Sequence, residues 1–151
     1  MVEAGFKYNL SDILAAIGRV QLTRAEALLQ MRRDIAARYD VAFEADDRFI
    51  IPPTGPADAR HLYPLRLAAG EKMLERDDYI QRLQELGIGV SVHFIPLHSM
   101  PYYAERYELA DADFPEAMNS FRHSISLPIW PGMSGEMIDR VITSVVQVAG
   151  E

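Results

Sequence analysis

The longest hydrophobic pattern of the chain spans residues 11–44 and predicts a helix. Apolar side chains recur there every three or four positions, which is the spacing of one helix face. They are Ile13, Ile17, Val20, Leu28, Met31, Ile35, Tyr39 and Phe43. Ser11 is a good N-cap for this helix. Thr23 followed by Glu26 has the spacing of a capping box, so the pattern also predicts a break or kink near residues 21–23.

Shorter patterns after residue 44 predict a small sheet packed with helices. The expected strands are 49–51, 61–67, 89–94 and 124–129, and the expected helices are 75–86, 114–123 and one that Ser134 caps. The apolar stripe of this last helix consists of Met137, Ile138, Val141, Ile142, Val145 and Val146. Pro64 cannot donate a ladder hydrogen bond, so its strand is expected at a sheet edge or with a bulge. Gly87 ends a helix where a left-handed backbone is favoured. Because strands alternate with helices, the class is α/β or α+β with three or four strands.

The composition is that of an ordinary globular domain. The 151 residues are 49% hydrophobic and 25% charged, which fits one domain with a real core. The net charge of -7 argues against nucleic acid or an anionic membrane as the main partner. The chain has no cysteine, which excludes disulfides and thiolate metal sites. It also lacks an apolar run of about 18 residues and a secretory leader, so a cytoplasmic protein is expected.

Local chemistry alone supplies no complete active site. The four histidines do not have the spacing of a zinc site, because the best pair, His93 and His98, is separated by Pro96. No metal site is therefore expected. The only lysines, Lys7 and Lys72, lie in polar settings, whereas a catalytic amine needs burial or a neighbouring charge that lowers its pKa.

The loop before the first helix is the stretch with the clearest binding chemistry. Gly5 permits an unusual backbone, Asn9 carries an amide, and Ser11 opens the helix. A capped helix with a tight lead-in is the interpretation that these residues favour by themselves. The alternative is a phosphate site, because a helix N-terminus attracts anions.

Several motifs, taken in order over nearly the whole chain, resemble one enzyme family. They are Gly5-Phe6-Lys7-Tyr8-Asn9-Leu10-Ser11-Asp12-Ile13, Ala15-Ala16-Ile17-Gly18, Gln21-Leu22, residues 32–39, Gly87-Ile88-Gly89-Val90, His93-Phe94, Pro96-Leu97-His98, residues 125–129 and residues 131–134. The sequence resembles the C-terminal part of the DegT/DnrJ/StrS-type sugar aminotransferases, which depend on pyridoxal 5'-phosphate (PLP). Within that family, residues 7–10 are most similar to the UDP-4-amino-4-deoxy-L-arabinose–oxoglutarate aminotransferase type.

The resemblance implies the small C-terminal domain of the type I aminotransferase fold. Residues 1–44 would be a loop and long kinked helix linking from a large domain, and residues 45–151 the small domain. In the family, the large domain carries the PLP pocket and the Schiff-base lysine. The chain is therefore expected to hold no catalytic residue, to bind no cofactor alone and to be inactive alone. The intact enzyme would be a homodimer that transfers an amino group from glutamate to a keto-sugar nucleotide, in the biosynthesis of polysaccharides or antibiotic sugars.

The resemblance also assigns site residues. Asn9 matches the asparagine that reaches the PLP phosphate of the partner subunit, and Tyr8 lies beside it in sequence. His93 and Phe94 match a pair near the sugar nucleotide, with His98 close to them. Leu10 stands where many members have arginine, so a ligand contact from that position is in doubt.

Three alternatives remain open at this stage. His93 can be a strand-end histidine bonded to the backbone rather than a binding residue. The whole chain can be a non-enzymatic dimerising or regulatory module, because its first helix has an apolar stripe that needs a partner. Relatives in which histidine replaces the lysine dehydrate sugars instead of transaminating them.

Overall fold

The computed structural model describes residues 5–68 and 74–150, so Met1–Ala4 and Lys72 lie outside the described residues. The helices are α1 (Asp12–Phe43), α2 (Arg76–Glu85), α3 (Pro101–Tyr107), α4 (Pro115–His123) and α5 (Gly135–Val148). The strands are β1 (Phe49–Ile50), β2 (Tyr63–Leu67) and β3 (Ser124–Leu127). Two 3-10 turns, η1 (Leu97–Ser99) and η2 (Asp111–Asp113), flank α3.

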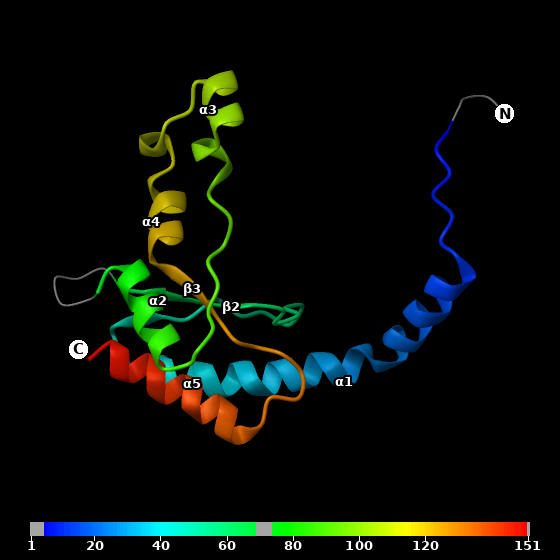
Figure 1. Ribbon diagram of the computed structural model, residues 1–151, viewed down its shortest axis with the longest axis horizontal. Helices are drawn as coiled ribbons and strands as arrows, with labels where there is room; N and C mark the ends of the chain where they lie inside the picture. Colours follow the sequence, from blue (N-terminus) through cyan, green and yellow to red (C-terminus); the bar gives the residue numbers. More distant parts are fainter. Residues whose placement is uncertain (1–4, 69–73, 151) are drawn as a thin grey trace.

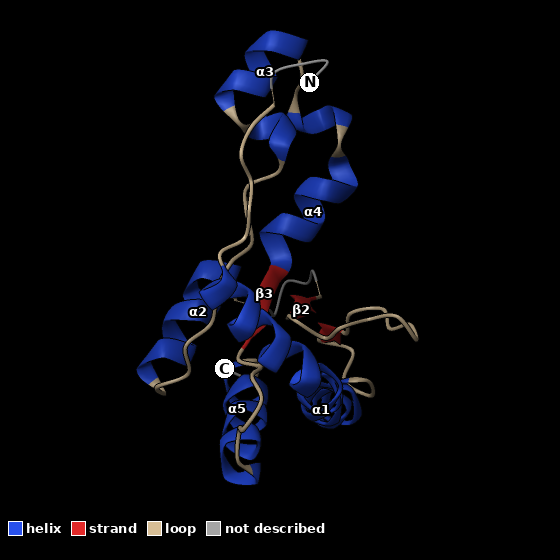
Figure 2. Cartoon of the chain, turned by 90° about the vertical axis from the view of Figure 1, so that its right-hand side faces the viewer, coloured by secondary structure: helices blue, strands red, loops and turns tan. Residues whose placement is uncertain are grey.

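A body of three helices and a small antiparallel sheet carries two projecting arms (Figure 1). The body consists of the sheet, α2, α5 and the C-terminal half of α1. One arm is the N-terminal half of α1 with the loop before it. The other arm contains α3 and α4, which stand in one column above the sheet (Figure 2). Mixed helices with a three-stranded sheet confirm the predicted fold class. In the part of the chain that the structure describes, no helix has the length and apolar character needed to cross a bilayer.

Helix α1 is continuous, so the predicted division into two helices is wrong. Ser11 caps it as expected, with its Oγ accepting from the Leu14 N–H at 3.4 Å. The hydroxyl of Thr23 does not cap a second helix, because it donates to the carbonyl of Val20 at 2.7 Å. Such back-bonding keeps the residue inside a helix and often bends it. The helix does change direction along its N-terminal half (Figure 1).

Strand β2 occupies the centre of the sheet, so the predicted edge position of Pro64 is wrong. Pro64 lies opposite Ser126 of β3, whose backbone N–H and C=O both bond to Ser91 at 2.8 and 3.2 Å. The backbone nitrogen of Pro64 therefore faces the other side of β2. There, β1 pairs only with Arg66 and Leu67. The missing N–H thus falls at a position where no strand partner needs it.

One other predicted strand is wrong, and one helix was not predicted. Residues 89–94 do not form a strand, because only Ser91 makes an isolated bridge, to Ser126, before the segment leaves the sheet. Helix α3 was not anticipated, and Pro101 at its first turn was the available signal. None of its residues is buried, so packing does not require an apolar stripe on this helix.

The C-terminal end of α2 and the start of α5 confirm the predicted roles of Gly87 and Ser134. Gly87 follows α2 with φ +76, the left-handed conformation that glycine tolerates best. A Cβ at this position would lie only 2.6 Å from Nη2 of Arg140. The same Nη2 donates to the carbonyl of Leu86 at 2.7 Å and so ties α5 to the end of α2. Ser134 caps α5 by accepting from the Met137 N–H at 3.2 Å.

Three buried tyrosines join the helices to the rest of the core. The hydroxyl of Tyr39 donates to the carbonyl of Pro128 at 2.8 Å, and that of Tyr79 donates to the carbonyl of Val145. The hydroxyl of Tyr63 donates to the carboxylate of Asp40 at 2.8 Å. Burial raises the pKa of all three phenols well above the ordinary value, because a phenolate would lose its hydration.

An ion pair between Arg60, in the loop before β2, and Asp40 of α1 fixes that loop to the helix. Arg60 is 6% exposed, and its Nη2 lies 2.9 Å from Oδ2 of Asp40. The other oxygen of Asp40 accepts from Tyr63, so this carboxylate joins α1, the loop and β2. Asp58 adds a contact at 3.5 Å to Nε of Arg60. The guanidinium thus has acceptors on two sides, which offsets its loss of hydration.

We expect Asp40→Ala to lower the free energy of unfolding by about 2–3 kcal/mol, because a buried guanidinium and a phenol each lose their acceptor. Urea denaturation measures the difference. The matched control is Asp139→Ala, since Asp139 pairs with Arg38 at 2.5 Å on the exposed surface. That change should stay within about 0.5 kcal/mol. Equal losses in the two variants would contradict the assignment.

The buried tyrosines also predict a loss of stability in alkali. Below a pH of about 10, the phenols are protonated in both states, so their contribution is complete. Above it, the unfolded chain ionises while the folded core does not, and stability should fall by about 1.4 kcal/mol per pH unit for each buried tyrosine. Urea midpoints measured across this range test the slope. Tyr79→Phe should make it shallower, and an unchanged slope would exclude that residue.

Candidate functional site

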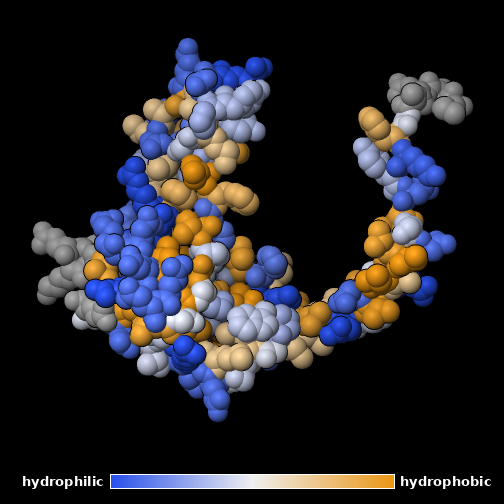
Figure 3. Space-filling model, viewed as in Figure 1, coloured by the Kyte–Doolittle hydropathy of each residue, from blue (hydrophilic) through white to orange (hydrophobic). Residues whose placement is uncertain are grey.

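The N-terminal loop presents its side chains at the far end of one arm. Residues 5–10 are all exposed, and Tyr8 is 86% exposed. The ring of Phe6 lies 5.6 Å from that of Tyr8, so the two aromatics support each other rather than a core. The projecting half of α1 continues this exposed surface, with hydrophobic side chains gathered along it (Figure 3).

The donors of this loop suit one end of a phosphorylated ligand. The amide of Asn9 and the ammonium of Lys7 lie in the loop directly before the start of α1. The first-turn amides of a helix are anion donors, although Asp12 adds a negative charge at the same end. Amide and ammonium groups of this kind are donors that a phosphate group accepts from. The loop does not enclose a site by itself, because the side chains of residues 5–10 are all exposed to solvent.

His93 lies at the base of the other arm and is held by a side chain, not by the backbone. Its Nε2 lies 2.6 Å from Oγ of Ser126, a hydrogen-bond distance. The strand-end interpretation with a backbone partner therefore does not describe this contact. His93 lines a cavity of about 320 Å³ between β2, α4 and residues 93–96. The other lining residues are Pro64, Phe94, Pro96, Ala117, Ser120, Phe121 and Ser124.

Phe94 and His98 have opposite environments, although only four positions separate them. Phe94 is 91% exposed and offers a free aromatic face at the mouth of the same cavity. His98 is only 7% exposed, and its ring stacks on Phe114 with centroids 4.5 Å apart. A histidine so covered cannot touch a ligand as Phe94 can.

The predicted residues form two groups, one on each arm. Tyr8 and Asn9 lie beyond the end of α1, whereas His93, Phe94 and His98 lie in the arm with α3 and α4 (Figure 1). One chain does not bring them together into a single site. Within the described ranges, no three His, Asp or Glu side chains are grouped as a metal site would require.

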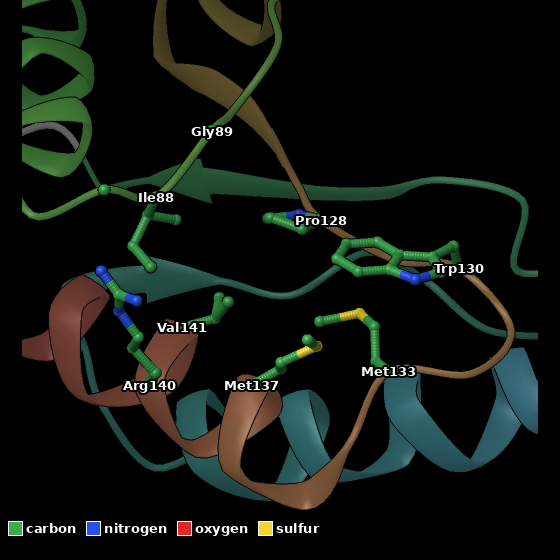
Figure 4. A pocket seen from close by; sticks show the side chains of 9 residues that line it. Ile88, Gly89, Pro128, Trp130, Met133, Met137, Arg140 and Val141 are labelled. Carbon is green, nitrogen blue, oxygen red and sulfur yellow. The ribbon is translucent and has the colours of Figure 1, made fainter.

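An apolar cavity that the sequence analysis did not anticipate lies beside α5 (Figure 4). Its volume is about 330 Å³, and Ile88, Trp130, Met133, Met137 and Arg140 contribute to its lining. Met137 was assigned to the core stripe of the last helix but is 51% exposed at this cavity. None of the predicted site residues lines it. Trp130, the single tryptophan of the sequence, was the residue that could have indicated this cavity.

Comparison with known families identifies the chain. A model of the DegT/DnrJ/EryC1/StrS aminotransferase family matches residues 1–146. The chain belongs to this family. The motifs that suggested the resemblance therefore identified it correctly.

Relatives cover the chain almost completely but are much longer than it. The spore coat polysaccharide biosynthesis protein SpsC of Bacillus subtilis is 40% identical over 144 residues, which are 93% of this chain and 37% of SpsC. The uncharacterized protein MJ1066 of Methanocaldococcus jannaschii is 37% identical over 153 residues, covering 100% of this chain and 40% of MJ1066. The chain thus spans about two fifths of the length of these family members.

Solved structures of family members have the same fold. Spr1654 of Streptococcus pneumoniae, assigned as a sugar aminotransferase, matches in its PMP form with a TM-score of 0.86 and 34% identity, over 99% of this chain and 37% of Spr1654. The aminotransferase PseC of Helicobacter pylori, involved in pseudoaminic acid biosynthesis, matches with a TM-score of 0.87 and 25% identity, over 98% of this chain and 40% of PseC. The chain matches the C-terminal part of their aminotransferase fold.

We expect Ser126→Ala to release His93 without disrupting the sheet. The backbone bonds between Ser126 and Ser91 do not need the hydroxyl, so the stability cost should be that of one hydrogen bond, about 1 kcal/mol. The imidazole resonances of His93 in NMR spectra should broaden or shift to those of a mobile ring. Ser144→Ala, at a buried serine in α5, is the control. An unchanged His93 spectrum in the Ser126 variant would contradict the contact.

Proposed function

We propose that this chain is the C-terminal part of a PLP-dependent aminotransferase that acts on a keto-sugar nucleotide with glutamate as amino donor. The family match over residues 1–146 carries the proposal. Its similarity to Spr1654, which has been solved in PLP and PMP forms, supports the choice of cofactor. The similarity to SpsC supports a sugar substrate in polysaccharide biosynthesis. We place the enzyme in the cytoplasm.

The two arms would serve different parts of such a site. When bound, PLP accepts an amino group and passes it on, and the protein supplies binding and orientation. The Asn9 amide would donate to the phosphate of the cofactor held by the partner subunit, with Tyr8 beside it. The exposed ring of Phe94 and the imidazole of His93 would contact the sugar nucleotide at the cavity beside α4. Active sites shared across a homodimer would explain why one chain keeps these groups apart.

This chain alone should be inactive. Lys7 is exposed at the loop, whereas an amine that forms a covalent bond with PLP needs desolvation or a neighbouring cation. Lys72 lies outside the described residues. The described part of the chain therefore offers no amine in a suitable environment. Glutamate and PLP added to the purified chain should give no amino transfer, and turnover linked to either lysine would overturn this part of the proposal.

A non-enzymatic dimerising module is the alternative that the exposed half of α1 favours. Hydrophobic side chains without cover lie along it, as expected for a surface that another chain contacts. They are Ile13, Leu14, Ile17, Val20 and Leu22. Light scattering on the purified chain separates the cases. A stable dimer of the purified chain, together with no PLP binding by the SpsC protein that carries this chain in place of its own matching part, would support the module. A monomeric chain would exclude it.

The role of Asn9 can be tested in a chimera in which this chain replaces the matching part of SpsC. Transamination of a keto-sugar nucleotide is expected. Asn9→Ala should weaken PLP retention about 10- to 100-fold, because it removes a hydrogen bond to a charged phosphate. Equilibrium dialysis of the cofactor measures the change. The control is Asn119→Ala, at the exposed asparagine of α4.

Equal cofactor affinity in the wild-type and Asn9→Ala chimeras would reject the assignment of Asn9 while leaving the enzyme class intact. A folded chimera that binds PLP but transfers no amino group to any keto-sugar nucleotide would contradict the proposed reaction itself.

A further inference from the structure

Two histidines lie at the two ends of the segment that presents Phe94. At the lower end, Ser91 bridges Ser126 through the backbone, and His93 meets the hydroxyl of the same serine. At the upper end, His98 enters the interior of the α3–α4 arm as part of η1. The residues between the anchors are turned outward, with Phe94, Ile95 and Leu97 all exposed.

The upper anchor is a small polar cluster around Asp111. Nε2 of His98 lies 3.6 Å from Oδ1 of Asp111, and the same oxygen accepts from Oγ of Ser99 at 2.5 Å. Nη2 of Arg122, from α4, lies 3.8 Å from the other carboxylate oxygen. Asp111 therefore faces polar groups from η1 and from α4 at once. The ring of Phe114 covers His98 from the side.

Nε2 of His98 is buried without a hydrogen-bond partner among the residues that the structure describes. A distance of 3.6 Å to Oδ1 of Asp111 is too long for a hydrogen bond, but this carboxylate oxygen can accept one if the two groups move closer. A buried nitrogen without a partner is costly, and Asp111 lies on an exposed turn that can shift toward it. A proton on Nε2 would turn this contact into a charge-assisted hydrogen bond.

We propose that His98 is a positioning residue whose Nε2–H, directed at Asp111, latches η1 to η2, the turn before α4, and so fixes where Phe94 is presented. The inference deepens the proposed function, on which its meaning for substrate binding rests. It changes the expected role of His98, because a side chain that is 7% exposed acts through Phe94 and not on the substrate. The chain would then hold its substrate-facing segment by a histidine at each end.

Hydrogen exchange in the 151-residue chain tests the latch directly. The amides of Ser99 and Met100 report on it, because they bond to the carbonyls of Pro96 and Leu97 within η1, at 2.9 and 3.1 Å. His98→Phe keeps a ring to stack on Phe114 but removes Nε2. It should speed exchange of both amides about tenfold, as expected when a local opening loses one such contact.

Rescue by a conservative variant separates the latch from simple packing. His98→Gln places an amide N–H near the position of Nε2 and should restore slow exchange of both amides. The matched control, His123→Phe in α4, removes a histidine that bonds to the carbonyl of Asn119 and should leave the η1 amides unchanged. The Ile88 amide, which bonds to the carbonyl of Leu83, verifies that each variant is folded.

Three outcomes would overturn the latch. They are unchanged exchange in His98→Phe, exchange in His98→Gln as fast as in His98→Phe, and equal acceleration in His123→Phe. If His98→Phe does not fold, Asp111→Ala provides a second test, since it removes the acceptor on an exposed turn. Normal exchange at Ser99 and Met100 in that variant would also overturn the proposal.

The consequence for binding is measured in the SpsC chimera. His98→Phe should raise KM for the sugar nucleotide about tenfold while kcat changes little, because the misplaced Phe94 weakens binding and not the later chemistry. His98→Gln should restore KM. An unchanged KM would remove His98 from the presentation of Phe94. If the chimera is inactive, the exchange results still decide whether the latch exists, so failure of the proposed function and failure of the latch are distinguishable.

Discussion

Burial of the C-terminal half of α1 is the interaction on which the body of the protein depends. Tyr39 and Asp40 are neighbours on this helix, and each bonds to a different part of the chain. The hydroxyl of Tyr39 donates to the carbonyl of Pro128, directly after β3. The carboxylate of Asp40 accepts from Arg60, in the loop before β2, and from Tyr63 of β2. Apolar contacts of Ile35 and Phe43 fill the space around these bonds. The helix is thus fixed by hydrophobic area and by polar groups that must be satisfied once they are buried.

The N-terminal half of the same helix has no such cover, and this contrast shapes the possible function. The helix is continuous from Asp12 to Phe43, so its exposed half carries the loop before it away from the buried half. Asn9 lies in that loop and is exposed. On the opposite arm, η1 and α4 carry Phe94 outward. The two groups of predicted site residues therefore lie on separate arms, and a single chain does not join them.

The sequence predicted much of the fold because local rules and tertiary packing agree there. The caps at Ser11 and Ser134 and the left-handed Gly87 depend on backbone chemistry within a few residues, and all three are confirmed. The predictions failed at two positions whose hydrogen bonding the local pattern left open. The Thr23 hydroxyl donates to the carbonyl of Val20 inside the same helix instead of capping a new one. A short β1 leaves Pro64 without a strand partner on that side of the central strand. The site residues came from motifs, and their roles stay predictions.

The family and the caps at Ser11 and Ser134 followed from the order of side chains and from near neighbours. The exposure of the predicted site residues required the folded chain. His93, Phe94 and His98 fall within six positions, yet one is tethered to Ser126, one is free in solvent and one is buried against Phe114. The physical reason is that exposure and hydrogen-bond partners are set by elements far away in the chain. Ser126 of β3 holds His93, and Phe114, directly before α4, covers His98.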